Sequence, residues 1–393
     1  MQIATYGLGL YKGTARDDLL VVHFPQGASA GGVFTTSQTR SADVDWCRES
    51  LAAGKGRARA LVVNAGNSNA FTGAAGIAKN RSTVAAVREL AKCDAHEVFL
   101  AATGVIGEPL PDNFVANGVA KAWPSLAAPD WSRAANAIRT TDTFAKAAGE
   151  TVDLNRRNVS IAGFAKGSGM IQPNMATTLN YVFTDAALGP NAVQALIARY
   201  CDLTYNCITV DGDTSTSDTL MLFATGAAGG EPIDDPDDPR LAGFCEGLHR
   251  VLKDLALQIV RDGEGATKLI EIEVGGAVSD VSAKAIAASV ANSPLVKTAL
   301  AAGDANWGRV VMAVGKAGEP IERDRMTIHF GDHLVARDGG RAPDYSEARA
   351  TAAVKGPEIR IRIDAGVGGA GRATVWTCDL TDGYVKINGA YRS

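Results

Sequence analysis

The chain has 393 residues, of which 46% are apolar and 21% charged, and its formal net charge is −4. This length is typical of two or three domains, and the balanced charge excludes the broad positive field expected of a nucleic-acid or anionic-membrane binder. No apolar run approaches the roughly 20 residues that span a bilayer. The first residues lack the pattern of a secretory signal, so we expect a cytoplasmic protein.

The cysteines and histidines show none of the spacings typical of metal sites. There are six cysteines without a CxxC pair and five histidines without an HExxH-like run, so the sequence predicts no bound metal. A long chain without an export signal keeps its thiols reduced, and we expect mostly buried free cysteines. Gly7-Leu8-Gly9 lacks the rest of a dinucleotide-binding fingerprint, which argues against nucleotide binding.

The first half of the chain alternates short apolar runs with stretches of helical periodicity. The runs predict strands over Asp18–Phe24, Ala60–Asn64, Val98–Ala101 and Val159–Phe164. Apolar residues at helical spacing predict helices over Ile77–Ala91 and Trp131–Ile138. Strands and helices in alternation indicate a layered α/β architecture.

The second half continues this pattern. Helices are predicted over Asn191–Tyr200, which follows Pro190, and over the amphipathic Pro239–Arg261. Residues 231–239 have the proline and charge content of an exposed loop. Ile270–Val274 and Ile359–Asp364 alternate between apolar and charged residues, which predicts strands with one solvated face. Together these patterns predict sheets covered by helices.

One segment has the layout of a self-cleaving threonine. In Ala165–Asp185 (AKGSGMIQPNMATTLNYVFTD) a glycine-rich turn leads to Ala176, and Thr177 opens the next run. Glycines permit the strained backbone that attack by Thr177 on the Ala176 carbonyl requires. Cleavage would free an α-amine with a pKa of about 7.7–8.0, suited to act as base for its own hydroxyl. An ordinary glycine-rich loop before a strand explains the same residues.

The segment AKGSGMIQPNMATTL resembles the processing signature of the ornithine acetyltransferase family, the bifunctional glutamate/ornithine N-acetyltransferases of arginine synthesis. Seven further blocks resemble family blocks in family order: Asn64–Gly73, Ala102–Gly107, Thr140–Thr143, Asp211–Thr219, Gly263–Lys268, Ser293–Arg309 and the terminal INGAYRS. Because they span nearly the whole chain, the sequence is identified as a member of this family. The resemblance implies layered sheets in a self-processing, N-terminal-nucleophile-like fold of the DmpA/ornithine acetyltransferase type.

The family also implies an assembly and a reaction. Cleavage of the Ala176–Thr177 bond would give an α chain, 1–176, and a β chain, 177–393, assembled as an α2β2 heterotetramer from two precursors. N2-acetylornithine would donate acetyl to Thr177, ornithine would leave, and L-glutamate would become N-acetylglutamate in a ping-pong reaction. No bound cofactor is implied, although some relatives also take acetyl-CoA as donor.

Roles for individual residues follow from the matching motifs. Thr177 resembles the nucleophile, and Thr103 and Gly104 resemble the oxyanion-hole pair, whose donors face the developing negative oxygen. Lys166 resembles a substrate-binding lysine that would pair with the α-carboxylate shared by both amino acids. Further substrate contacts are implied at Thr143, Glu264, Asn388 and Ser393. Taken alone, Thr143 suits a cap or turn, Lys166 and Glu264 suit surface charges, and Ala102–Gly107 suits a strand-end turn.

Three positions depart from the family pattern. Ser393 stands where threonine is common, Phe71 where many relatives carry cysteine, and Thr178 where a larger apolar residue is frequent. None of them removes a group from the implied mechanism. Asp211–Thr219 begins like a calcium loop but lacks the glycine and glutamate of that template. We expect its side chains to order the main chain near the site instead.

Two other functions use the same residues differently. A self-processing hydrolase of similar layered fold would use a freed Thr177 but deliver acyl groups to water. A catalytically silent binding protein would keep the fold without the reaction. The wider set of family blocks, including Lys166, Glu264 and the INGAYRS terminus, favours the acetyltransferase.

Overall fold

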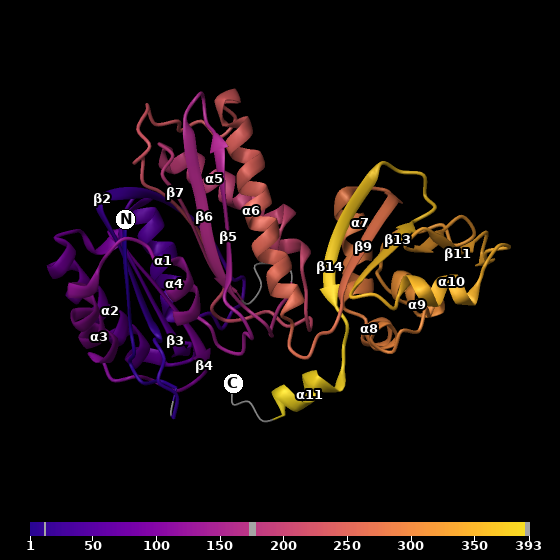
Figure 1. The fold of residues 1–393 in the computed structure, drawn as a ribbon, viewed down its shortest axis with the longest axis horizontal. Coiled ribbons are helices and arrows are strands. Elements are labelled where there is room, and N and C mark those ends of the chain that lie inside the picture. The colour runs from indigo at the N-terminus through magenta and orange to yellow at the C-terminus, as the bar shows by residue number, and fades with distance from the viewer. Residues whose placement is uncertain (12, 173–177, 390–393) are drawn as a thin grey trace. The chain divides into compact units, whose positions relative to one another are not determined.

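A computed structural model describes residues 1–11, 13–172 and 178–389, and it forms two compact units (Figure 1). Of these residues, unit 1 comprises 1–206 and 213–259, and unit 2 comprises 207–212 and 260–389. The predicted boundary between residues 176 and 177 falls within the sequence range of unit 1. Among the described residues, no helix combines the length and the apolar character needed to cross a membrane.

Unit 1 is built on one bent sheet. Its strands run in the order β4-β3-β2-β8-β7-β6-β5, and β1 pairs with β2 outside this path. They are β1 (Gln2–Tyr6), β2 (Leu19–Phe34), β3 (Arg57–Asn67), β4 (Val98–Val105), β5 (Lys146–Asp153), β6 (Asn158–Lys166), β7 (Leu179–Thr184) and β8 (Thr219–Ala224). The four predicted strands of this half are confirmed, although each is longer than predicted.

The bend lies in β2. Its first part pairs with β3, the register shifts between His23 and Ala28, and its last part, from Ser29 to Phe34, pairs with β8. The two ends of the sheet therefore face each other across a core of large apolar side chains. In this core Phe223 of β8 stacks on Phe24 of β2 at 5.0 Å between ring centroids. The prediction for β2 ended at Phe24 because the small, glycine-rich continuation has no apolar alternation.

Helices pack on both faces of the unit 1 sheet, and those over 42–53 and 131–137 contribute side chains to the core that contains Phe24 and Phe223. The helices are α1 (Ala42–Ala53), α2 (Gly73–Ala91), α3 (Phe114–Ala122), α4 (Trp131–Ala137), α5 (Pro190–Leu203) and α6 (Ala242–Arg261), of which α6 continues into unit 2. Short 3-10 turns occur at Ala95–Glu97, Trp123–Ser125, Tyr205–Cys207 and Pro239–Leu241. Helices α2 and α3 pack on the outer side of β2–β4, whereas α6 runs along β5 and β6, where Gly247 leaves room for Val152 (Figure 1).

The predicted helices of this unit are confirmed with small changes at their ends. Pro239–Arg261 begins as a 3-10 turn because Asp238 caps the Arg240 N–H, and the α-helix starts at Ala242. The predicted loop over residues 231–239 is confirmed up to residue 238, and Pro239 begins this 3-10 turn. The order of strands and helices confirms the layered α/β architecture.

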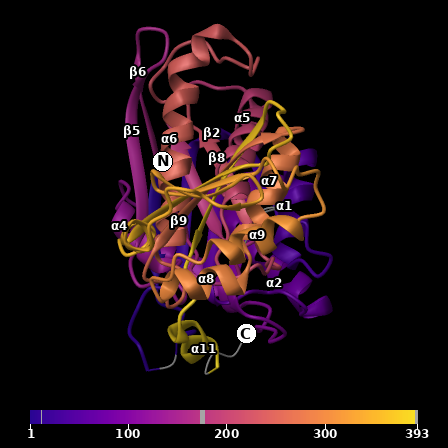
Figure 2. The ribbon, with the colours of Figure 1, turned by 90° about the vertical axis from the view of Figure 1, so that its right-hand side faces the viewer.

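Unit 2 holds a second, smaller sheet with strand order β12-β11-β10-β13-β9-β14. Its strands are β9 (Leu269–Ala277), β10 (Thr327–Phe330), β11 (His333–Arg337), β12 (Gly340–Arg341), β13 (Glu358–Asp364) and β14 (Gly371–Cys378). Its helices are α7 (Asp280–Ala291), α8 (Pro294–Ala301), α9 (Trp307–Gly315), α10 (Glu347–Ala353) and α11 (Asp382–Asn388). Figure 2 shows α7, α8 and α9 gathered beside β9.

The predicted alternation in unit 2 is confirmed. Ile272 of β9 and Ile361 of β13 lie opposite each other in parallel register and are fully buried in the core that α7 and α9 complete. On the other face, Arg360 forms ion pairs with Glu271 and Glu273 at 3.2 Å and 2.5 Å. Apolar residues thus fill one face of the sheet and paired charges the other.

Candidate functional site

Two of the predicted residues meet in unit 1 at the ends of distant strands. Thr103 lies near the end of β4 and Lys166 is the last residue of β6. The Lys166 Nζ donates a hydrogen bond to the Thr103 Oγ1 over 3.1 Å. Both side chains are buried, at 7% and 4% exposure, so the lysine is not the surface charge that its sequence context alone suggested. The bend in β2 brings these two strand ends together.

Gly104 has a backbone that only glycine adopts readily. Its φ is +129°, and a methyl group there would overlap the backbone of Gly66 and the Asn67 nitrogen. Gly66, on β3, also has a positive φ, and the register between β3 and β4 shifts beside it. Glycine adopts such a φ without strain, so the close approach of β3 and β4 explains why this position is a glycine.

A buried polar network supports this segment from behind. Lys79 of α2 forms an ion pair with Asp43 at 3.1 Å, and both side chains are only 2% exposed. Asn64, on β3, accepts from Lys79 at 3.4 Å and donates to the Asn67 carbonyl at 2.9 Å. The network fixes the turn that faces Gly104. Sequence reasoning missed Lys79 and Asp43, although a lysine on the apolar stripe of α2 was a visible signal.

Asp142 neutralises part of the charge near Lys166. Its Oδ1 accepts from the Lys146 Nζ at 2.6 Å and from the Gly167 N–H at 2.7 Å. Burial alone would raise the pKa of Asp142, but Lys166 and Lys146 outweigh burial and lower it to about 2. Asp142 is therefore ionised at neutral pH. It lies inside the TTDT block, in which the family resemblance implies a role for Thr143, a residue that is exposed before β5.

Asp218 is a second buried acid, and its pKa shifts in the opposite direction from that of Asp142. Asp218 is 1% exposed, and its Oδ1 accepts from the Thr178 N–H at 2.7 Å. Burial raises the pKa of Asp218 well above its ordinary value, against the opposing effects of the Thr178 N–H and Lys166. Two lysines, Lys146 and Lys166, and two acids, Asp142 and Asp218, are therefore buried in this part of unit 1. A lysine ammonium is a group that can pair with a carboxylate ligand.

The Asp211–Thr219 segment orders main chain, as predicted. Within unit 1 the Ser215 carbonyl accepts from the Thr35 hydroxyl at 2.6 Å, and the Ser217 N–H donates to the Ser215 hydroxyl at 3.0 Å. The Ser217 hydroxyl reaches the Ser68 carbonyl at 3.4 Å. Ser68 in turn donates to the Val105 carbonyl, so this segment supports the loop around Gly104.

Two other predicted residues meet in unit 2. The Asn388 Nδ2 donates to the Glu264 Oε2 at 2.7 Å, and Glu264 is 9% exposed, more buried than its sequence context suggested. Gly265 has a φ of +72° and lies against the Tyr384 nitrogen, which lets α11 pack on this loop. The Thr381 hydroxyl donates to the Gly265 carbonyl at 2.6 Å. Three predicted residues, Ala176, Thr177 and Ser393, lie outside the described residues.

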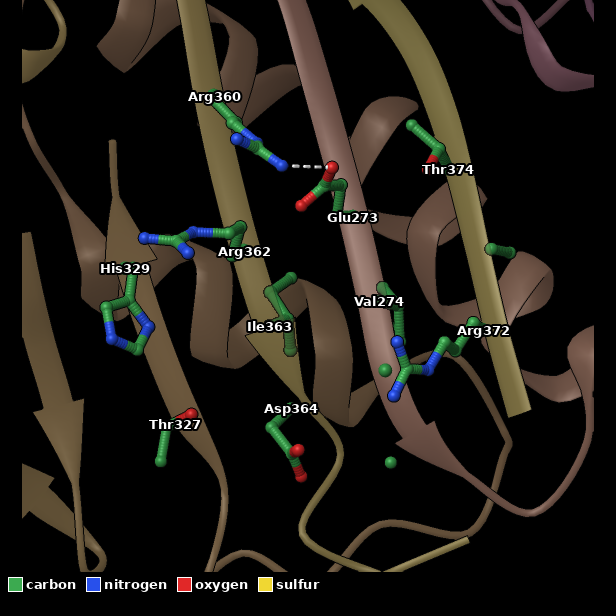
Figure 3. Close-up of a pocket in the computed structure, with 13 residues that line it drawn as sticks. Glu273, Val274, Thr327, His329, Arg360, Arg362, Ile363, Asp364, Arg372 and Thr374 are labelled. Carbon is green, nitrogen blue, oxygen red and sulfur yellow. Dashed lines mark hydrogen bonds and ion pairs between the residues drawn. The ribbon is translucent and has the colours of Figure 1, made fainter. Parts of the chain in front are cut away.

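A cavity of about 700 Å³ lies on the charged face of the unit 2 sheet (Figure 3). Arg360, Arg362, Arg372 and Asp364 line it, and Figure 3 shows the Arg360–Glu273 ion pair at its edge. Arg362 bonds the Gly331 carbonyl at 2.9 Å and Asp332 at 3.1 Å. None of the predicted site residues lines this cavity, and its charges are largely paired across strands. We therefore assign the candidate site to the other clusters.

Comparison with known proteins identifies the family of the chain. The ArgJ family model matches residues 2–393. The chain is 55% identical over 397 residues to the arginine biosynthesis bifunctional protein ArgJ of Brucella suis, which covers 100% of this chain and 95% of that protein. The corresponding protein of Rhizobium meliloti is 54% identical with the same coverage. A crystal structure of ArgJ from Bacillus halodurans, 40% identical, superposes with a TM-score of 0.51 over 54% of this chain and 98% of that one. The chain therefore belongs to the ArgJ family, as its sequence blocks predicted.

Proposed function

We propose that this chain is a glutamate N-acetyltransferase of arginine biosynthesis, working in the cytoplasm through an acetyl ester on Thr177. The observation that carries the proposal is the buried hydrogen bond between Lys166 and Thr103. A carboxylate is a ligand with which a lysine ammonium pairs, and both N2-acetylornithine and L-glutamate carry one. The bifunctional ArgJ proteins to which the chain is similar are named for arginine biosynthesis.

Maturation would create the nucleophile. The Thr177 hydroxyl attacks the Ala176 carbonyl carbon, the bond to the Thr177 nitrogen breaks, and an ester forms. One water then cleaves this ester, which leaves a carboxylate on Ala176 and a free amine and hydroxyl on Thr177. Thr178 directly follows in the chain, and Leu179 pairs with Lys166 across β6 and β7. This pairing supports a nucleophile close to Lys166.

The transfer would then follow two symmetrical steps. The Thr177 hydroxyl attacks the acetyl carbonyl of N2-acetylornithine, its proton passes to the leaving α-nitrogen, and ornithine departs. The α-amine of L-glutamate next attacks the acetyl ester, which releases N-acetylglutamate and restores the hydroxyl. Thr103 and Gly104 would hold the negative oxygen of each tetrahedral intermediate, and each donor of this kind is worth about 2.7–4 kcal/mol.

The remaining assigned residues would hold the amino acids. Lys166 would bind the α-carboxylate, with Thr143 beside it. Glu264 would pair with the amino groups of ornithine, oriented by Asn388, and Ser393 would complete the contacts. We propose no bound cofactor, with acetyl-CoA as a second donor to glutamate, and an α2β2 assembly of two self-cleaved precursors.

Cleavage and acetylation can be tested on the same sample. Purified protein should run as two bands on a denaturing gel, and mass spectrometry should place the break between Ala176 and Thr177. After addition of N2-acetylornithine, the β-chain end should gain the mass of one acetyl group. Thr177→Ala should stay uncut and inactive, whereas Thr151→Ala, at an exposed position of β5, should behave as the unmodified chain. An uncut but active protein would refute the proposal.

The donor and the acceptor need a separate assay. Cleaved protein is incubated with L-glutamate and either N2-acetylornithine or acetyl-CoA, and N-acetylglutamate is measured. Formation from the first donor supports the transferase, and formation from the second extends it to both steps. Release of free acetate with no N-acetylglutamate would identify a hydrolase instead.

A further inference from the structure

An ion pair is buried behind the strand ends that carry Thr103 and Gly104. Lys79 of α2 and Asp43 of α1 lie 3.1 Å apart, and each side chain is only 2% exposed. Burying two charges removes them from water, and apolar residues of the same size often give a fold that is at least as stable. Stability therefore does not account for this pair, and its contacts indicate another role.

The lysine is connected to Asn67 through one amide. The Lys79 Nζ donates to the Asn64 Oδ1 at 3.4 Å, and the Asn64 Nδ2 donates to the Asn67 carbonyl at 2.9 Å. Because an ammonium group can only donate, it keeps the Asn64 oxygen on its own side and the Asn64 NH2 group towards Asn67. Lys79 thus sets the orientation of the donor that binds the Asn67 carbonyl.

The aspartate is connected to the same residue by a second path. The Asp43 Oδ2 accepts from the Asn69 Nδ2 at 2.6 Å, and the Asn69 N–H donates to the Asn67 Oδ1 at 3.0 Å. The Asn67 Nδ2 in turn donates to the Glu108 carbonyl at 2.5 Å. Asn67 is therefore held at its main-chain oxygen and at both ends of its side-chain amide. Two of these three contacts lead back to the ion pair.

Asn67 lies directly against Gly104. In the ladder between β3 and β4, Asn67 is in register with Thr103 and Val105, the residues on either side of this glycine. The peptide bond that joins Gly66 to Asn67 is also what a methyl group on Gly104 would overlap. A shift of Asn67 would therefore move the main chain at Gly104. Groups that stabilise a transition state have to be held within about 0.5 Å of their productive positions, so such a shift would matter.

We propose that the Lys79–Asp43 pair positions the oxyanion hole, by fixing the two amides that hold Asn67 and, through Asn67, the main chain at Gly104. This inference rests on the proposed function. Lys79 and Asp43 act through other residues, so they are positioning residues, and their loss lowers kcat while the KM values of both amino acids stay nearly unchanged. A pair that only stabilised the fold would leave the kcat of the folded enzyme as it is.

The test separates the charges from the stability of the fold. Lys79→Met alone would leave a buried carboxylate without its partner, which can prevent folding. Asp43→Asn/Lys79→Met removes both charges together, and the asparagine oxygen can still accept from Asn69. We expect this double variant to unfold at a temperature close to that of the unmodified chain. Its kcat per cut chain should fall ~10–100-fold, with little change in the KM for N2-acetylornithine or glutamate.

Val87→Ala is the matched control, because Val87 is fully buried on the same helix and belongs to the apolar core on which α2 packs. It should lower the unfolding temperature and leave kcat per cut chain unchanged. A normal kcat in the double variant would overturn the inference, whereas N-acetylglutamate formed by the unmodified enzyme would still uphold the proposed function.

A second variant breaks the connection without removing a charge. Asn64→Ala leaves the ion pair in place and removes the donor to Asn67, so it should also lower kcat. Added to the double variant, it should cause little further loss, because both changes act along one path. If the double variant does not fold, a normal kcat in Asn64→Ala overturns the inference. The inference is also wrong if neither variant folds, or if both fold but remain uncut, since the pair would then serve folding or self-cleavage.

Discussion

Lys166 and Thr103 touch through a 3.1 Å hydrogen bond although β3, β2, β8 and β7 lie between their strands in the sheet order. The contact exists because β2 changes partners along its length and folds the sheet over. A residue proposed to bind the substrate carboxylate is thereby joined to one proposed to hold the oxyanion. Carboxylate binding and acyl transfer would use adjacent groups.

Replacing Lys166 by methionine should weaken binding of both amino acids. A hydrogen bond to a charged group contributes about 1.5–3 kcal/mol, so the KM for N2-acetylornithine and for glutamate should each rise roughly 10–100-fold. Steady-state kinetics measure this, and thermal unfolding shows whether the fold survives. Lys355→Met, at an exposed position of unit 2, is the control and should match the unmodified enzyme. Unchanged KM values would exclude a carboxylate contact at Lys166.

Removing the Thr103 hydroxyl should slow the chemical step. Thr103→Val keeps the shape of the side chain, and loss of an oxyanion donor should lower kcat by about 10²–10³-fold. Thr103→Ser retains the hydroxyl and should recover most of the rate. Single-turnover acetylation of the β-chain end measures the step directly. Equal rates for the valine and serine variants would show that the hydroxyl has no part in it.

Gly104 should tolerate no side chain. Its φ of +129° and its approach to Gly66 make Gly104→Ala strained and overlapping. Gly107 provides the comparison, since its φ of +82° is also positive but its surroundings are open. We expect Gly107→Ala to lose about 1 kcal/mol of unfolding free energy and Gly104→Ala clearly more. Urea unfolding measures both, and equal losses would show that the close approach to β3 is unimportant.

Asp142→Asn should destabilise the chain because it leaves two buried lysines without their anion. Loss of one partner of a buried ion pair costs about 3–5 kcal/mol. The pKa of Asp142 in the folded chain, about 2, lies below its ordinary value of 3.8, so the carboxylate stabilises the fold above that value and ceases to do so as the pH falls through 2.

The free energies of unfolding of the unmodified chain and of Asp142→Asn should therefore differ by a constant amount near neutral pH. The difference should disappear as the pH falls from about 4 to about 2. Urea unfolding at several pH values measures the difference. Asp153→Asn changes an exposed acid and serves as control. A difference in free energy of unfolding that grows as the pH falls would contradict the lowered pKa of Asp142.

Glu264 and Asn388 should act as a pair in ornithine recognition. Glu264→Gln should lower kcat/KM for N2-acetylornithine more than for glutamate, because only ornithine carries a second amino group. A double-mutant cycle on kcat/KM for N2-acetylornithine should show that the effects of Glu264→Gln and Asn388→Ala are not additive. The coupling free energy should be about 0.5–3 kcal/mol, since the two side chains share a hydrogen bond. Additive effects would mean that Asn388 does not orient Glu264.

The sequence predicted the elements that carry a clear period. Ile270–Val274 and Ile359–Asp364 alternate, and both became strands with one charged face. By contrast, β7 and β8 are buried throughout and show no alternation, so nothing local separates them from other apolar runs. The short helices α8 and α9 were not predicted, although Ser293 and Pro294 give the first of them a good start. Helix α8 lies inside the block Ser293–Arg309, whereas α9 begins there and extends to Gly315.

The site was predicted through family motifs rather than through physical signals. Lys166 and Glu264 looked like surface charges, since their burial follows from strands that are distant in the sequence. Asp142 lies in the family block Thr140–Thr143 and Asp218 in the block Asp211–Thr219, but the family motifs imply a role for neither. Their importance comes from buried neighbours, namely Lys146 and Lys166 for Asp142 and the Thr178 N–H for Asp218, and no spacing rule shows these contacts.

In the sheet of unit 1, β7 and β8 are held between β2 and β6, which come from the other side of the proposed break. Continuity of the backbone from β6 to β7 helps to assemble this order, because it confines the strands to one another during folding. It is not needed to maintain the order afterwards. A matured enzyme that has been fully denatured should thus fail to regain its native form on dilution, whereas the uncut Thr177→Ala chain should recover it. The lifetime of the matured enzyme would then depend on its rate of unfolding and not on an equilibrium free energy of unfolding.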